Sequence, residues 1–250
     1  MKKIAVCLNT HFLNDEVYNR FKALKENPLE GFDFYIICNN ELLENKNLNI
    51  VNKDGYPIFF YSSKDLKNNG YILRETSLRY NNKSVMWVNG SLMPINLFHK
   101  IKPDYDYYWS IEYDIIFNGQ WRYFFDKVHE IEWDFCTSHY EEASKEWWWY
   151  DDIYFPEEVK EMWSEDFKRY QSFNTICAFS NKFIEYLDTL YKLGYYGNCE
   201  QTLPTAAVNN KEMKAIDLSS IGLCTKESNN WKRTYINMDI ENIIYHPVKI

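Results

Sequence analysis

A run of large apolar and β-branched side chains that ends in two carboxylates constrains the fold more than any other feature of this sequence. The run occupies residues 107–111, and Glu112 and Asp114 follow it. Such a run predicts a strand that is buried on both faces, and acids at its exit need a partner if they are to leave water. We therefore expect a central strand of a sheet with two acids at its carboxyl end.

These two acids are placed to share one cation. They are two positions apart, so in extended chain both side chains point the same way. Carboxylate oxygens suit hard divalent ions such as Mg²⁺ or Mn²⁺, and ligands of open α/β sheets bind beyond the carboxyl ends of the strands. The alternative is a strand end with two solvated acids.

Alternating strand and helix patterns predict one α/β domain over residues 1–250. Apolar runs at 4–8 and 32–38 flank a helix that Asn14 would cap, with Val17, Phe21 and Leu24 on its inner face. We expect further helices at 94–102, from Asn118 past 128, at 157–170 and from Ser180 to 194, further strands at 58–61, 133–138 and 173–179, and a short strand or helix end at 85–90. No linker divides the chain, so we expect a Rossmann-related mixed sheet with helices on both sides.

Aromatic side chains are too numerous to serve the core alone. They make up 18% of the chain, with 9 Trp and 21 Tyr, so some should line a cleft or a partner surface. Trp147, Trp148 and Trp149 are consecutive and fit no regular period. We interpret them as an acceptor-binding loop at the mouth of a cleft, with packing or association as the alternative.

The net charge limits the kinds of binding partner, and the cysteine pattern and hydropathy indicate the cellular compartment. A net charge of −8 argues against a nucleic-acid partner. The six cysteines are scattered without a Cys-x-x-Cys pair, which favours reduced core thiols over a zinc site or a disulfide framework. No stretch approaches 18 apolar residues, so we expect a cytoplasmic protein, with peripheral association at the inner membrane face as the alternative.

Three blocks of sequence resemble the signature blocks of a known enzyme class. The usual dinucleotide, P-loop, serine-hydrolase and zincin motifs are absent from the sequence. The blocks at 109–121, 197–205 and 245–249 are similar, in this order, to those of bacterial GT-A-type glycosyltransferases of lipopolysaccharide and capsule synthesis, in particular the galactofuranosyltransferase-like group. The resemblance spans residues 4–250. It implies a GT-A-like fold, a UDP-sugar donor, a glycan or lipid-linked glycan acceptor, and Mn²⁺ or Mg²⁺.

The resemblance also implies roles for single residues. Asp114 would bind the metal directly, and His246 would be a late ligand; a structural histidine beside proline is the alternative. Glu112 stands where the family's Asp-x-Asp motif has its first Asp, and would reach the ion through water or contact the donor's ribose or sugar. Glu200 would be the base of an inverting transfer, or else an acid that stabilises a helix N-terminus.

The residues predicted to bind the nucleotide-sugar donor lie at strand exits or carry a positive charge. Strand exits in α/β folds meet nucleotides, and basic groups near the C-terminal block would assist the leaving phosphate, with surface solvation as the alternative. Lys232 and Arg233 are additional cations of this kind. We assign six residues to the donor: Asn9, Thr10, Asn39, Arg74, Trp109 and Lys249.

Two other functions use some of the same features. A metal-dependent nucleotidyltransferase or pyrophosphorylase would share the acid-and-metal site but is expected to carry a Gly-rich phosphate loop, which the sequence lacks. A non-catalytic carbohydrate-binding protein would explain the aromatic surplus but has no use for Asp114 and His246. The donor sugar, the acceptor, the linkage, the stereochemistry and the oligomeric state stay open.

Overall fold

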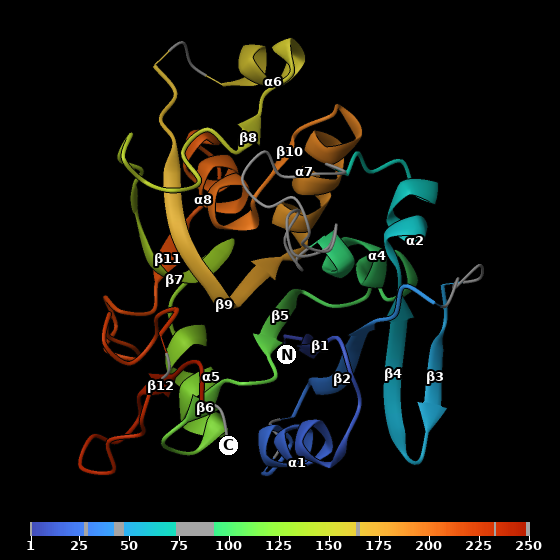
Figure 1. Cartoon of the computed structure of the whole chain (residues 1–250), viewed down its shortest axis with the longest axis vertical. Coiled ribbons are helices and arrows are strands. Elements are labelled where there is room, and N and C mark those ends of the chain that lie inside the picture. The colour runs from blue at the N-terminus through green and yellow to red at the C-terminus, as the bar shows by residue number, and fades with distance from the viewer. Residues whose placement is uncertain are drawn as a thin grey trace.

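The central layer is an eight-stranded mixed sheet (Figure 1). The computed structural model describes residues 2–27, 30–42, 48–73, 93–163, 166–232 and 234–248. Its strands are β1 (Ile4–Thr10), β2 (Phe32–Asn39), β3 (Ile50–Lys53), β4 (Tyr56–Tyr61), β5 (Tyr107–Glu112), β6 (Ile116–Phe117), β7 (Phe135–Glu142), β8 (Ile153–Tyr154), β9 (Tyr170–Ser180), β10 (Tyr196–Gly197), β11 (Ala215–Asp217) and β12 (Ile244–Tyr245). Its helices are α1 (Asp15–Leu24), α2 (Ser63–Asn68), α4 (Met93–Ile101), α5 (Trp121–His129), α6 (Glu157–Met162), α7 (Asn181–Lys192) and α8 (Cys199–Asn209).

Strand β5 lies inside this sheet, as its apolar run predicts. The strand order is β11-β7-β9-β5-β1-β2-β4-β3. Parallel pairs join β5 to β1, β1 to β2, β2 to β4 and β11 to β7. Strand β9 runs antiparallel between β5 and β7, and β3 runs antiparallel to β4. The predicted α/β class with a mixed sheet is confirmed.

Helices cover both faces of the sheet, because alternate strand residues point to opposite sides. One core cluster joins Cys7 of β1 and Ile37 of β2 to buried side chains of α4, α7 and α8. The other joins Val6 of β1 and Ile36 of β2 to buried side chains of α1 and α5. Figure 1 shows the two sets of helices on either side of the strands.

Short-range signals located most helices correctly. The Asn14 side chain accepts the Val17 N–H at 3.0 Å and begins α1, whose buried residues include Phe21 and Leu24, as predicted. Ser180 likewise caps α7 by accepting the Phe183 N–H at 3.1 Å. The strands predicted around 4–8, 32–38, 58–61, 133–138 and 173–179 and the helix at 94–102 are all present.

Three local predictions need correction or lie outside the described residues. Asn118 does not cap α5: the N-cap is Gln120, and the Asn118 amide donates to the Ile240 carbonyl at 2.8 Å. Helix α6 ends at Met162, and Tyr170 belongs to β9, because the sheet recruits it opposite Glu142. The element predicted at 85–90 lies outside the residues that the structure describes.

The cysteines are free, and most are in the core. All six are unpaired thiols, and only Cys199 is not fully buried. Five of the six are buried, as predicted for core thiols. Within the described ranges, no helix has the length and apolar character needed to traverse a bilayer.

Candidate functional site

A short strand pair carries the C-terminal segment to the exit of β5. Strand β6 begins just after Asp114 and pairs antiparallel with β12, so that Tyr245 lies opposite Ile116. His246 follows Tyr245 directly and is therefore brought to the loop that holds Asp114. The predicted convergence of residues from two distant blocks of sequence is observed.

Glu112, Asp114 and His246 form one group of possible metal ligands. One ligand atom from each lies within 4.8 Å of the other two. His246 Nε2 is 3.2 Å from Glu112 Oε2 and 3.4 Å from Asp114 Oδ1. The Asp114 and His246 side chains are 11% and 9% exposed, whereas Glu112 is 37% exposed. Two of the three groups are therefore shielded from water, whereas Glu112 is partly exposed to solvent.

The His246 ring is held by the chain segment at 228–230. Its Nδ1 lies 3.0 Å from the Asn230 carbonyl oxygen, so Nδ1 carries a proton and donates it there. The His246 backbone N–H donates to the Ser228 carbonyl at 2.9 Å. These bonds turn Nε2 toward the two carboxylates, which is the arrangement usual for a metal-binding histidine.

The acids keep His246 charged. Burial lowers the pKa of His246, but hydrogen bonds and negative charge from Asp114 and Glu112 outweigh burial and raise this pKa to about 9. An imidazolium thus balances the carboxylates at neutral pH. A divalent cation at the same place would take over that balance and leave Nε2 as a neutral ligand.

Asp114 itself indicates that a cation fits here. Its Oδ1 is buried and, apart from the 3.4 Å ion pair with His246 Nε2, has no hydrogen-bond partner among the described residues. A buried carboxylate oxygen with so few partners needs a cation beside it, which is the His246 imidazolium in the metal-free protein and would be the metal ion when one binds. Two carboxylates and one imidazole on rigid neighbouring elements are a suitable donor set for Mn²⁺.

Glu200 is positioned by a glycine turn and a helix cap. At Gly197, φ is +150° and an added Cβ would clash with the Asp152 carbonyl oxygen, so only glycine lets β10 lie against β8. The Asn198 side chain then accepts the Glu200 N–H at 2.8 Å and begins α8. From β9, Asn174 donates to the Cys199 carbonyl at 2.8 Å. Glu200 thus lies in the first turn of α8, but Asn198 supplies the cap.

The protonation of Glu200 is coupled to the metal-ligand group. Burial and the negative charge of Glu112 raise the pKa of Glu200 to about 7, although His246 and a hydrogen bond from Trp149 act in the opposite direction. Glu200 therefore lies within electrostatic reach of Glu112 and His246. A carboxylate with a pKa near neutrality is well matched to accept a proton.

The three tryptophans lie in the turns between β7 and β8. Trp148 is 52% exposed, while Trp147 and Trp149 are half-buried. Trp149 is the residue that donates a side-chain hydrogen bond to Glu200. The predicted aromatic loop is present, and one of its rings is in contact with the predicted base.

Two of the predicted donor residues lie beside the metal-ligand group. Asn9 pairs with Glu112 across β1 and β5, and its amide donates to the Ser110 hydroxyl. Thr10 ends β1 and donates to the Phe12 carbonyl at 2.8 Å. Asn39 ends β2, where it donates to Glu41 at 2.8 Å. Strand order places Asn39 one strand farther from β5 than the other two.

The structure contradicts the prediction that Trp109 contacts the donor. The Trp109 side chain is fully buried between β5 and α5, where its indole packs against Phe124 and donates to His129 Nε2 at 3.2 Å. A side chain without exposed surface does not contact a donor, so Trp109 is a core residue. Arg74 and Lys249, and the additional cation Arg233, lie outside the described residues.

Sequence reasoning missed the polar segment that supports His246. Asn229 is buried, donates to Ser138 Oγ at 2.8 Å and accepts from Thr175 Oγ1 at 3.0 Å, which ties residues 228–230 to β7 and β9. Nothing in the sequence distinguishes Asn229 and Asn230 from the many other asparagines of the chain. Only the fold reveals their task.

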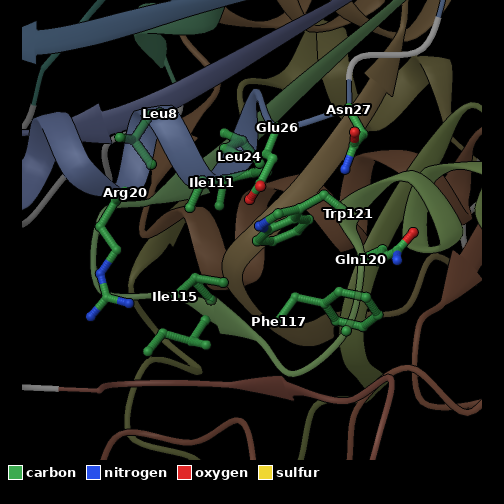
Figure 2. A pocket seen from close by; sticks show the side chains of 13 residues that line it. Leu8, Arg20, Leu24, Glu26, Asn27, Ile111, Ile115, Phe117, Gln120 and Trp121 are labelled. Atoms are coloured by element: carbon green, nitrogen blue, oxygen red, sulfur yellow. The ribbon is translucent and has the colours of Figure 1, made fainter.

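A separate hollow lies between α1, the exit of β5 and the start of α5. Its lining is mostly apolar and includes Leu24, Ile115 and Trp121, and Figure 2 shows Arg20 on the far side of it from Trp121. The metal-ligand group and Glu200 are not among its lining residues. This hollow is therefore distinct from the candidate site.

Comparisons with known proteins give distant structural similarities. Neither the family models nor the curated proteins contain a match to the sequence. The chain is similar to an active-site mutant of LgtC, with a TM-score of 0.41 and 10% identity over 86% of this chain and 73% of that chain. It is similar to apo mouse xyloside xylosyltransferase 1, with a TM-score of 0.41 and 8% identity over 87% of this chain and 86% of that chain. It is also similar to the galactosyltransferase LgtC in complex with donor and acceptor sugar analogs, with a TM-score of 0.39 and 10% identity over 86% of this chain and 73% of that chain. At such low identity and TM-score these similarities assign no role to any residue of this chain.

Proposed function

We propose that this chain is a metal-dependent, GT-A-type glycosyltransferase that moves a sugar from a nucleoside diphosphate to a glycan hydroxyl. One observation carries the proposal. Glu112, Asp114 and His246 converge around the buried Oδ1 of Asp114, which has His246 Nε2 at 3.4 Å, and Glu200, with a pKa of about 7, lies within reach of their charges. An ion site beside a neutral-range base is what transfer from a diphosphate requires.

Asp114 and His246 would hold the ion directly, with Glu112 at the open side. The imidazole favours Mn²⁺ over Mg²⁺, because Mg²⁺ prefers oxygen ligands alone. When bound, the ion would stabilise negative charge on the leaving diphosphate. The Nδ1–H bond to the Asn230 carbonyl keeps Nε2 of His246 pointed at the site.

Glu200 would accept the proton of the attacking hydroxyl. That oxygen forms a bond to the anomeric carbon while the bond from this carbon to the diphosphate oxygen breaks, and the proton moves to the Glu200 carboxylate. A single displacement of this kind inverts the anomeric centre. The charge of Glu112 favours protonation of Glu200 as the proton arrives.

Substrates would approach from two sides. The tryptophan loop at 147–149 offers ring faces for an acceptor sugar, and exposed Trp148 is its outermost contact. Asn9 and Thr10 lie beside β5 on the donor side, where we also place Asn39, Arg74 and Lys249. We assign a UDP-sugar as donor, a glycan or lipid-linked glycan as acceptor, and synthesis of lipopolysaccharide or capsule in the cytoplasm or at the inner membrane face as the setting.

Calorimetry with UDP tests the proposal directly. The full chain should bind UDP far more tightly with Mn²⁺ than in chelator, and should slowly hydrolyse at least one sugar in a panel of nucleotide sugars. Equal UDP binding with and without metal would contradict it. A nucleotidyltransferase would instead release pyrophosphate from a nucleoside triphosphate and a sugar phosphate, and a carbohydrate-binding protein would bind sugar equally well in chelator.

A further inference from the structure

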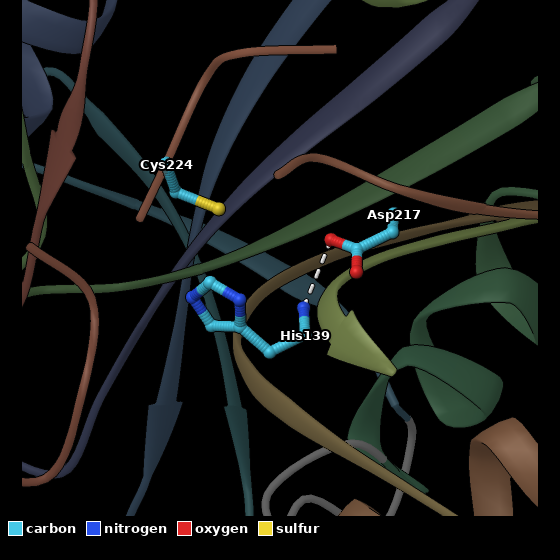
Figure 3. A group of neighbouring side chains, drawn as sticks. All are labelled: His139, Asp217 and Cys224. Carbon is cyan, nitrogen blue, oxygen red and sulfur yellow. Dashed lines mark hydrogen bonds between the residues drawn. The ribbon is translucent and has the colours of Figure 1, made fainter. Parts of the chain in front are cut away.

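A second group of possible metal ligands lies away from the candidate site. His139 in β7, Asp217 at the end of β11 and Cys224 in the following loop each offer a ligand atom within 4.8 Å of the other two. Figure 3 shows the three side chains pointing toward one shared space. Cys224 is buried, and the other two are half-buried. Residues from three separate segments are thus brought together, and none of the three has a role in the proposed sugar transfer.

The His139 ring is fixed in one tautomer. Its Nε2 lies 3.1 Å from the Thr225 carbonyl oxygen, so Nε2 carries the proton and donates it there. The remaining nitrogen, Nδ1, therefore has a free lone pair for a metal. Donation of the second ring N–H to a backbone carbonyl is the usual support of a metal-binding histidine.

The backbone around His139 departs from a regular strand. Its φ is +54°, in the left-handed region, and the pairing of β7 with β9 shifts register between Ser138 and Glu141. A bulge of this kind turns a side chain away from its ordinary direction. Here the His139 side chain is the one redirected, toward Asp217 and Cys224 (Figure 3).

The Asp217 carboxylate is oriented by two backbone donors. Its Oδ1 accepts the His139 N–H at 2.9 Å and the Ser219 N–H at 2.8 Å. Both bonds hold the carboxylate in place before any ion arrives. The histidine and the carboxylate of the group are therefore preorganised.

We propose that His139, Asp217 and Cys224 bind a zinc ion. A nitrogen, a carboxylate oxygen and a sulfur are ligands that Zn²⁺ accepts together, and a thiolate selects against Mg²⁺ and Mn²⁺. Zinc bonds of about 2.0–2.3 Å require the three ligand atoms to close by roughly 1 Å, which rotation of the Cys224 side chain would supply while the His139 ring keeps its bond to Thr225. On binding, the thiol loses its proton to solvent and the sulfur bonds to the ion.

The zinc ion would hold the segment that positions His246. His139 already donates to Thr225, and the same segment continues to Ser228 and Asn230, whose carbonyls accept the His246 N–H and Nδ1–H. A bond from Cys224 through zinc to β7 and β11 would fasten the start of this segment to the sheet. The role is structural, and it stands whether or not the proposed transfer is correct.

Zinc titration of the full chain tests the site. The protein, stripped with chelator, is titrated with Zn²⁺ in an Asp114→Asn, His246→Gln background, which leaves only Glu112 of the other metal-ligand group. Cys224→Ser and His139→Gln are compared with Cys38→Ser, which replaces a thiol that is also 3% exposed but lies in β2. With Co²⁺ in place of zinc, a near-ultraviolet thiolate-to-metal band reports sulfur ligation.

We expect one equivalent of Zn²⁺ in the background protein and in Cys38→Ser, and binding at least about 100-fold weaker in Cys224→Ser and His139→Gln. The cobalt band should be present in Cys38→Ser and lost in Cys224→Ser. Failure of the background protein to bind zinc, unchanged affinity in His139→Gln, or a cobalt complex without the thiolate band overturns the proposal. Near-ultraviolet circular dichroism verifies that each variant is folded, and His139→Gln decides alone if Cys224→Ser is not.

Discussion

Trp149 donates a side-chain hydrogen bond to Glu200, so a residue of the tryptophan loop lowers the pKa of the proposed base, although by less than burial and Glu112 raise it. The bond favours the charged carboxylate and opposes the effects of burial and of Glu112. The loop proposed to receive the acceptor is therefore in contact with the carboxylate proposed to activate it.

Trp149→Phe should move the acidic limb of the pH profile to higher pH. Loss of the N–H removes a bond to the charged form, so the pKa of Glu200 should rise further above its value of about 7. The measurement is kcat/KM against pH at saturating Mn²⁺. Trp148→Phe, at a ring that is 52% exposed, is the control and should leave the limb in place. Equal shifts in both variants would remove the role of Trp149.

Glu200→Gln should slow turnover strongly while leaving donor binding intact. The amide keeps the shape of the side chain but cannot accept the proton, and general-base catalysis contributes about 10²–10⁴-fold in rate. We expect kcat to fall by that factor and the Kd of UDP with Mn²⁺ to change little. The control is Glu161→Gln, an exposed helical acid in α6. Turnover near that of the control would show that the base lies elsewhere.

Asp114→Asn should remove the dependence of UDP binding on metal. The buried Oδ1 is paired with His246 Nε2 at 3.4 Å, and an amide leaves the volume unchanged while withdrawing the charge that the ion needs. Mn²⁺ affinity should fall by more than about 100-fold, measured by calorimetry. Asp126→Asn replaces an exposed acid of α5 and should bind as the unaltered protein does. Unchanged Mn²⁺ affinity in Asp114→Asn would refute the metal assignment.

His246 should make the stability of the metal-free protein depend on pH. Its folded pKa of about 9 lies above the ordinary value of 6.5, so its stabilising contribution is complete below pH 6.5 and is lost as pH rises through 9. In chelator, the free energy of unfolding of the unaltered protein minus that of His246→Gln should decline over this window, by no more than about 3 kcal/mol. Urea unfolding at several pH values measures it. A difference that stays flat from pH 6 to 10 would contradict the charge pairing described here.

Features that depend on neighbours in the sequence were predicted well. Asn14 and Ser180 cap their helices through the N–H groups three residues later, and β5 is buried because its own side chains are apolar. Asn118 does not cap the helix because its amide donates to carbonyls of the segment at 237–240. A contact with a segment so far along the chain cannot be predicted from the local sequence pattern. Tyr170 failed as a helical residue because β7 offered it a strand partner.

In the candidate site, too, some residues could be predicted from the sequence and others could not. Glu112, Asp114 and His246 were predicted to converge because acids beside a buried strand and ordered motif blocks carry a chemical signal, and the structure brings them together. The roles predicted for them and for Glu200 stay predictions. Asn230 was not predicted, since its contribution is a backbone carbonyl that any residue could supply. Trp109 was assigned to the donor although α5 covers it completely. The resemblance to the galactofuranosyltransferase-like group stays a prediction.

The pairing of β6 with β12 makes the candidate ion site depend on a segment outside the main sheet. All eight strands of that sheet lie between Ile4 and Asp217, whereas His246 follows β12. A molecule in which this short strand pair opened would keep its framework and still be unable to hold a cation at Asp114. Cation binding at Asp114 would therefore report on the closure of the β6–β12 pair and not on the folding of the sheet.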